Sequence, residues 1–216
     1  MRTKENRRLL KVGLTGGIGG GKSVVAAVFK KFGAIVLSAD EIGRELTETS
    51  PRIKKEIRKE FGPEVFDEMG SVDRKRLAKI VFSSKKKKEK LNAIIHPYVL
   101  EKIEEETSRL EKNLGVRYVI HEAALIFEAG VNKNLDYVVV IDADEEKRIQ
   151  RVMERDGVSR ADVVRRINFQ MPAKKKRELA DFVIENDSNL QSLEAKVRFL
   201  HNLFLKISES SSAANS

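Results

Sequence analysis

The feature that most constrains the fold is a glycine-rich segment near the N-terminus, between a short apolar run and an amphipathic stretch. Residues 16–23 read GGIGGGKS and fit the pattern G-x-x-x-x-G-K-[ST]. Glycines let the backbone turn its N–H groups inward, and a following helix N-terminus favours negative charge. Leu10–Leu14 predicts a strand that leads in, and Ser23–Phe32 predicts a helix that leads out. The segment therefore predicts an α/β fold that holds phosphate groups at this turn.

Two side chains at the end of this phosphate loop carry the expected chemistry. Lys22 is expected to reach β- and γ-phosphates as a point charge, and the Ser23 hydroxyl is placed to ligate Mg²⁺. The alternative is a strand-to-helix turn that binds nothing. The spacing, the Lys-Ser pair and the flanking elements all favour a bound nucleotide with Mg²⁺.

Composition limits the class of protein. With 216 residues the chain is long enough for one domain with an inserted subdomain, and it contains no cysteine. No apolar run approaches the roughly 20 residues that span a bilayer, and the N-terminus lacks a signal peptide. We expect a cytoplasmic protein with no membrane partner. The net charge of +9 favours a polyanionic ligand, either a nucleotide or a nucleic acid.

Four further apolar runs predict strands, at residues 34–38, 117–122, 135–142 and 182–184. Five strands that alternate with helices predict a doubly wound five-stranded parallel sheet. Residues 41 to about 114 predict successive helices that form an insertion, and residues 145–179 predict a basic helical segment. A last helix is expected over 188–207. We expect a poorly ordered extension over the first nine or so residues, or a late start of the first strand, and a disordered tail over 208–216.

Two acidic residues lie where predicted strands end, which is where parallel sheets bind ligands. Asp40 follows the second strand and could orient a hydroxyl nucleophile and accept its proton. The alternative is that Asp40 caps the helix that begins at Glu41. Glu122 ends the third strand and could face the metal or its water shell, or it could be an ordinary strand-end acid.

The basic segment contains three arginines on one predicted helix face, because Arg148, Arg151 and Arg155 are spaced i, i+3 and i+7. Such a face could close over a triphosphate as a lid and neutralise developing charge. A solvated basic helix would show the same spacing. In the preceding insertion, His96–Pro97 most simply marks a helix boundary, with a substrate contact as the alternative. The run Lys85–Lys88 most simply forms a solvated helix face, with a phosphate contact as the alternative.

From Val12 to about Leu205 the chain resembles the dephospho-coenzyme A kinase family in an ordered set of motifs. These are GLTGGIGGGKS at 13–23, ADEI at 39–42, HP at 96–97, EAALIFE at 122–128, Arg155-Asp156 with Arg166 and Gln170, and ADFVIEN at 180–186. The resemblance implies a single P-loop kinase domain over 1–216. Its core would comprise about 10–40, 116–144 and 180–207, with a helical acceptor-binding insertion over 41–115 and a helical lid over 145–179.

The resemblance also implies the reaction, in which the γ-phosphoryl group of ATP passes to the ribose 3′-hydroxyl of dephospho-coenzyme A. Asp40 matches the family's proposed base, and Arg151 and Arg155 match lid arginines that act with Lys22 on the phosphates. ATP would be held by Gly17, Gly19, Gly20, Gly21, Lys22, Ser23, Val24 and Asn186. The acceptor would contact Asp40, His96, Pro97, Leu125 and Glu128, and Mg²⁺ would be held by Ser23 and Glu122.

Some residues depart from the family pattern, and other functions stay open. Many members have aspartate at Ser38, threonine at Val24, serine at Gly20 and proline at Ala124. One alternative is a kinase for another small acceptor, such as a nucleoside or nucleoside monophosphate. Another is a P-loop nucleic-acid-binding or regulatory protein; tryptophan is absent and residues 132–135 lack the aspartate of N-K-x-D, which argues against it. We expect no nucleic-acid partner, and a monomer or small homo-oligomer.

Overall fold

The computed structural model describes residues 8–113 and 115–213. Contacts divide it into two compact units, one made of the chain up to Leu37 together with Arg109 onward, and the other of Ser38–Ser108. Most of the expected N-terminal extension, and residues 214–216, lie outside the described residues. Leu9 is buried with Leu110 and Val119, and the first strand begins directly after it at Leu10, which favours the alternative of a late strand start at this position.

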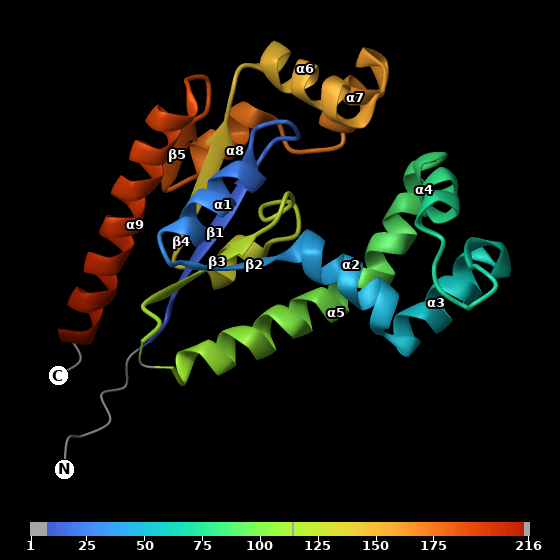
Figure 1. Cartoon of the computed structure of the whole chain (residues 1–216), viewed down its shortest axis with the longest axis horizontal. Helices are drawn as coiled ribbons and strands as arrows, with labels where there is room; N and C mark the ends of the chain where they lie inside the picture. The colour runs from blue at the N-terminus through green and yellow to red at the C-terminus, as the bar shows by residue number, and fades with distance from the viewer. Residues whose placement is uncertain (1–7, 114, 214–216) are drawn as a thin grey trace. The chain divides into compact units, whose positions relative to one another are not determined.

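The first unit is built on a five-stranded sheet with strand order β2-β3-β1-β4-β5 (Figure 1). The predicted doubly wound parallel sheet is confirmed: β1 pairs in parallel with β3 and β4, and β4 with β5. The chain moves outward from the central β1 to β2 and then returns to the other side, so the strand order reverses beside β1. The strands are β1 (Leu10–Gly16), β2 (Ile35–Ser38), β3 (Tyr118–Glu122), β4 (Tyr137–Asp142) and β5 (Phe182–Glu185).

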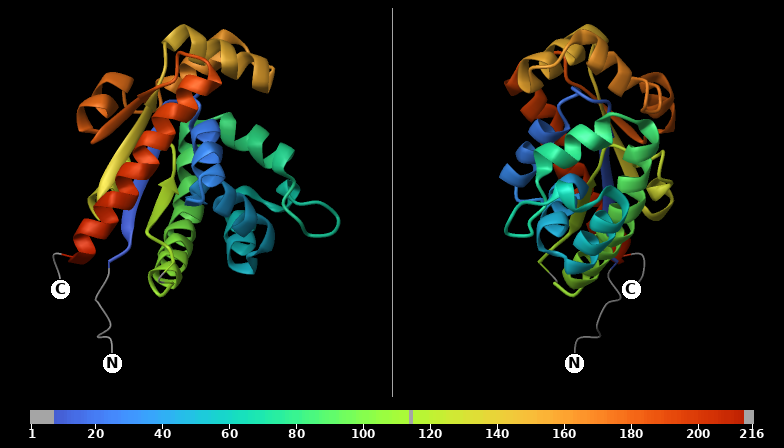
Figure 2. Two further views of the ribbon diagram at one scale, coloured as in Figure 1. Left: turned by 60° about the vertical axis from the view of Figure 1, so that its left-hand side comes forward. Right: turned by 90° about the vertical axis from the view of Figure 1, so that its right-hand side faces the viewer.

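Alternation of side chains along the strands gives the sheet two covered faces. Leu10, Val12 and Leu14 point to the face that packs against α1 (Lys22–Lys31) and α9 (Leu190–Ala213). Figures 1 and 2 show α9 running alongside the sheet. On the opposite face, Val138 and Val140 pack with Ile126 and Phe127, and α8 (Ala173–Leu179) contacts β4. Period-two burial on both faces fixes the register of the strands.

The segment between β4 and β5 begins with two helices, α6 (Glu145–Asp156) and α7 (Arg160–Ile167), which precede α8. A short 3-10 turn, η2 (Val131–Asn134), lies before β4. The helices α6 and α7 share a small apolar cluster of Ile149, Val152 and Val163, and Ile18 of the phosphate loop packs against it. The basic segment therefore contacts the loop.

The second unit is helical, as predicted. Ser50 ends one helix and caps the next through Ile53 N–H, with Pro51 at the first helical position. Its core contains Ile53, Ile57 and Val65. The elements are α2 (Ala39–Thr49), α3 (Pro51–Phe61), η1 (Pro63–Val65), α4 (Arg74–Phe82) and α5 (Lys85–Glu111).

Two predicted boundaries are wrong. The helix boundary expected at His96–Pro97 is absent, because α5 continues through Pro97. Apolar residues on both sides of the proline are packed, with Ile95 on the core of the unit and Val99 buried, and this packing offsets the backbone hydrogen bond that proline removes.

The second wrong boundary is the tail, expected to be disordered from Ser208. In the structure α9 extends to Ala213, Ser208 is buried, and its hydroxyl donates to Leu205 O. That local hydrogen bond and the burial continue the helix despite the serine-rich sequence. Along the chain that the structure describes, no helix combines the length and apolar character that crossing a membrane requires.

Candidate active site

The phosphate loop joins the end of β1 to the start of α1. Gly19 and Gly21 have φ of 76° and 98°, and a Cβ on Gly19 would lie 2.4 Å from the backbone oxygen of Arg148. Gly21 is the N-cap of α1, where no side chain accepts from the first N–H groups and no acidic residue lies in the first turn. These N–H groups therefore form the anion site that the sequence predicted.

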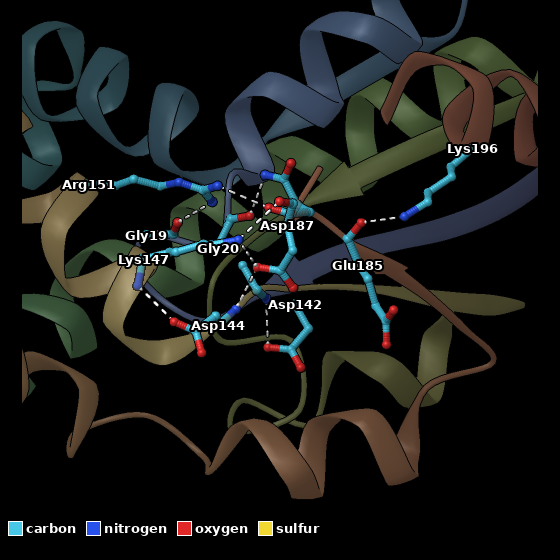
Figure 3. A network of polar contacts seen from close by, with 11 residues as sticks. Gly19, Gly20, Asp142, Asp144, Lys147, Arg151, Glu185, Asp187 and Lys196 are labelled. Atoms are coloured by element: carbon cyan, nitrogen blue, oxygen red, sulfur yellow. Dashed lines mark hydrogen bonds and ion pairs between the residues drawn. The ribbon is translucent and has the colours of Figure 1, made fainter. Parts of the chain in front are cut away.

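The outward-facing carbonyl groups of the loop are held by residues from the C-terminal part of the chain. Asn186 donates from Nδ2 to Gly20 O at 2.9 Å, and Arg151 donates to Asn186 O at 3.0 Å and to Gly19 O at 3.5 Å (Figure 3). These side chains fix the carbonyl groups of Gly19 and Gly20, and so hold the backbone of the loop in place. The structure thus brings the predicted residues Asn186 and Arg151 together at the loop.

A second set of contacts fixes the start of α6 to the segment after β5. The backbone N–H of Asp144 donates to the Asp187 carboxylate at 2.9 Å, and Lys147 Nζ donates to Asp187 O at 3.1 Å. Asn186 N–H donates to Asp142 O at 2.8 Å, at the end of β4. Figure 3 shows these contacts beside Gly19 and Gly20. They hold the N-terminal part of α6 against the phosphate loop.

The three arginines of the predicted lid face have different environments. The Arg151 guanidinium contacts loop carbonyls, and Arg148 is 3% exposed with its Nη1 against Gly17. Arg155 instead donates twice to the neighbouring Asp156, at 2.7 and 3.1 Å. Arg155, then Arg166, hold the pKa of the Asp156 carboxyl below its usual value. In this structure Arg155 is therefore an ion-pair partner of Asp156, and Arg148 and Arg151 are the arginines at the loop.

In the second unit, Asp40 lies exposed in the first turn of α2. The alternative that Asp40 caps this helix is wrong, because the Ser38 hydroxyl accepts from Glu41 N–H and takes that role. Burial lowers the pKa of His96 in α5, and the negative charge of Asp40 partly opposes that effect. A Cβ on Gly43 would lie 3.5 Å from Ile95 and Val99, so α2 and α5 approach closely here. The structure thus brings Asp40 and His96 together.

Comparison with known proteins identifies the family. The family model described as dephospho-CoA kinase matches residues 10–192. The chain belongs to the dephospho-CoA kinase family. A dephospho-CoA kinase of Clostridium tetani is 38% identical over 198 residues, which cover 91% of this chain and 87% of that protein.

Solved structures agree with this assignment. A Thermus thermophilus protein, TT1252, is 35% identical, with a TM-score of 0.75 and coverage of 90% of this chain and 97% of that one. A dephospho-CoA kinase from Campylobacter jejuni is 26% identical, with a TM-score of 0.63 and coverage of 91% and 97%. The fold is the P-loop kinase fold, as the sequence predicted.

The residues that the family resemblance assigned to Mg²⁺ fit that ion. Ser23 lies exposed in the first turn of α1, and Glu122 ends β3 in register with Leu14 of β1. Within the described ranges, no group of three or more His, Cys, Asp or Glu side chains could hold a metal. Mg²⁺ is commonly held by one or two carboxylates together with substrate phosphates. A hydroxyl, a carboxylate and nucleotide oxygens therefore form a suitable donor set.

The predicted acceptor residues Leu125 and Glu128 lie in the segment after β3. Glu128 pairs with Lys176 Nζ at 2.9 Å and accepts from Met171 N–H at 2.8 Å. Lys176 is fully buried and also donates to Ala124 O at 2.9 Å. Desolvation lowers the pKa of Lys176. The pair joins the Leu125–Glu128 segment to α8, so this part of the segment predicted as a lid is fixed to the core.

Sequence reasoning did not assign three residues to the site: Thr15, Gln170 and Lys176. The Gln170 side chain accepts from Ile18 N–H at 2.9 Å, and Thr15 donates from its hydroxyl to Ala124 O at 3.2 Å. A threonine in an apolar strand was an available signal for Thr15. The signal for Gln170 was its place among the family motifs. No sequence signal distinguished Lys176 from the neighbouring lysines of its basic run.

The buried ion pair leads to a stability prediction. Lys176→Met is expected to lower the free energy of unfolding by about 3 kcal/mol, because it removes the buried cation that pairs with the Glu128 carboxylate and donates to Ala124 O. Lys175→Met is the matched control, since Lys175 is exposed in the same helix. Urea denaturation of both variants tests the prediction. Equal stabilities of the two variants would contradict it.

Proposed function

We propose that this protein transfers the γ-phosphoryl group of ATP to the ribose 3′-hydroxyl of dephospho-CoA, giving CoA and ADP. The observation that carries the proposal is the phosphate loop, whose carbonyls are held by Asn186 and Arg151 in a chain that matches the dephospho-CoA kinase model over residues 10–192. The loop alone supports only nucleotide binding. The family membership supplies the acceptor.

The proposed roles follow from the position of each residue. The loop N–H groups and Lys22 bind the phosphates, and Asp40 orients the acceptor hydroxyl and takes its proton. Arg151 positions the loop through its contacts with Gly19 and Asn186. The acceptor is proposed to lie along His96, Pro97, Leu125 and Glu128. In such a reaction most of the rate enhancement comes from positioning and from stabilised charge.

The proposed metal is Mg²⁺, held by Ser23 and Glu122 together with nucleotide oxygens. When bound, the ion supplies positive charge to the β- and γ-phosphate oxygens. The exposed hydroxyl of Ser23 at the start of α1 and the carboxylate at the end of β3 support this assignment.

A coupled assay tests the function. The purified protein with Mg²⁺, ATP and dephospho-CoA is expected to form equal amounts of ADP and CoA, which chromatography separates. Lys22→Ala is expected to abolish product formation, because Lys22 supplies the point charge at the transferred phosphates. An acceptor panel with nucleosides and nucleoside monophosphates completes the design. Turnover of one of these, with none of dephospho-CoA, would overturn the proposed acceptor.

A further inference from the structure

Arg148 of α6 is a buried cation with incomplete pairing. The residue is 3% exposed, and its Nε is the single buried side-chain nitrogen or oxygen without a hydrogen-bond partner in the part of the chain that the structure describes. Its carboxylate contact is Glu145, at 3.3 Å from Nη2, and the Glu145 side chain is 64% exposed. Burying a charge is unfavourable unless the charge is well paired. The guanidinium is therefore suited to a further anionic partner.

The guanidinium points at the phosphate loop. Its Nη1 lies 2.1 Å from the position that a Cβ on Gly17 would occupy, so a side chain there would displace the guanidinium. The Arg148 carbonyl oxygen lies 2.4 Å from the Cβ position of Gly19. Both the side chain and the backbone of Arg148 thus pack against the first half of the loop.

The positive charges of Arg148 and Lys22 both affect the pKa of Lys176. Desolvation is the main cause of the lowered pKa of Lys176; Glu128 opposes it, and the charges of Lys22 and Arg148 add to it. Lys22 and Arg148 therefore both lie close enough to Lys176 to repel it. In this loop motif the lysine reaches the β- and γ-phosphates.

The neighbouring arginines already have partners. Arg151 donates to two backbone carbonyls, and Arg155 is paired with Asp156 through two hydrogen bonds. Of the three arginines on the predicted lid face, Arg148 is the one that keeps a buried, unpaired donor within the described residues. The family resemblance had pointed to Arg151 and Arg155.

We propose that Arg148 binds the terminal phosphoryl group of the nucleotide in the phosphate loop. The inference rests on the proposed function only in taking ATP as the donor. A phosphoryl oxygen accepts from the guanidinium of Arg148, whose Nε–H has no other partner, while Lys22 contacts the same end of the triphosphate. Charge-assisted hydrogen bonds of this kind are shorter and stronger than neutral ones. Arg148 thus contacts the nucleotide, and Arg151 positions the loop that holds it.

The test compares Arg148→Gln with Arg160→Gln. Arg160 lies in α7, is 54% exposed and pairs with Glu146, so the control removes the same charge from the same segment. Calorimetric titration with ATP and with ADP gives the dissociation constants. Arg148→Gln is expected to weaken ATP binding by about 10- to 100-fold and ADP binding by about threefold or less. The control is expected to change both by less than about twofold.

Three results would overturn the inference. The first is unchanged ATP affinity in Arg148→Gln, and the second is an equal loss for ATP and ADP, which would indicate that Arg148 only shapes the loop. If Arg148→Gln does not fold, Arg148→Lys keeps the charge but not the guanidinium, and a selective loss of ATP affinity is again expected. Failure of both variants to fold is the third result, since it would assign Arg148 to structure alone.

The two proposals fail separately. If the wild-type protein makes CoA while Arg148→Gln keeps its ATP affinity, the Arg148 inference fails and the function stands. If Arg148→Gln selectively loses ATP affinity while the wild-type protein does not phosphorylate dephospho-CoA, the proposed acceptor fails and the role of Arg148 stands.

Discussion

Asparagine in place of Asp40 is expected to lower kcat by about 10²- to 10⁴-fold and to change the dissociation constant for ATP by less than about twofold. Asparagine keeps the size of the side chain and can still contact a hydroxyl, but it cannot take the proton. Asp40 is exposed in the first turn of α2, and Ser38 rather than Asp40 caps that helix. The substitution therefore removes the carboxylate without removing the cap, and the fold should be retained.

The measurement is steady-state kinetics with dephospho-CoA, together with calorimetric titration of ATP. Glu45→Gln is the matched control, because Glu45 is an exposed acid in the same helix. Its kcat is expected to stay within about twofold of the wild-type value. If Asp40→Asn retains most of its turnover, Asp40 is not the base. If Glu45→Gln slows as much as Asp40→Asn, the effect belongs to helix charge rather than to proton transfer.

Alanine in place of Gly19 is expected to lower kcat/KM for ATP by about 100-fold, because the new Cβ would lie 2.4 Å from the backbone oxygen of Arg148. A backbone atom cannot rotate away as a side chain can, so either the loop or α6 must move. The φ of 76° adds strain for any residue with a Cβ. Both effects displace the N–H groups that bind the phosphates.

Gly33→Ala separates the two effects. Gly33 has a φ of 90°, but a Cβ there would meet no atom within 4 Å. We expect this variant to lose about 1–2 kcal/mol of stability and to retain its kcat/KM. Thermal unfolding and steady-state kinetics of both variants give the comparison. Similar kinetics for Gly19→Ala and Gly33→Ala would show that the close approach of α6 to the loop does not matter for activity.

The sequence alone predicted those parts of the structure that depend on local side-chain periodicity and backbone geometry. The apolar strands alternate with amphipathic helices, so the order of elements followed from periodicity, and Ser50-Pro51 and Gly62 mark helix ends through backbone geometry. The helix boundary predicted at His96–Pro97 was wrong because the effect of Pro97 on α5 depends on the packing of Ile95 and Val99, which no local pattern reveals. The disordered tail predicted from Ser208 was wrong for a similar reason, because the burial of Ser208 in α9 depends on packing.

The candidate site was predictable in its composition but not in its pairing. Helical spacing placed three arginines on one face without indicating which of them would contact the loop. Each of two arginines has an acid nearby in the sequence, but Arg155 forms two hydrogen bonds with Asp156, whereas Arg148 is buried against Gly17 and contacts Glu145 at 3.3 Å. The pairing of Lys176 with Glu128 joins residues far apart in the sequence. Only the fold brings them together.

The hydrogen bond from Asn186 to Gly20 spans 166 positions of the chain. The motif that binds phosphate precedes its partners in the chain: the N–H group of Ile18 and the carbonyl group of Gly20 gain their side-chain partners only when Gln170 and Asn186 have been synthesised. Contacts of such high sequence separation form late in folding because long loops must close first. During translation, the nucleotide site is therefore completed only after β5 and Asn186 have emerged from the ribosome, well after the motif that specifies it.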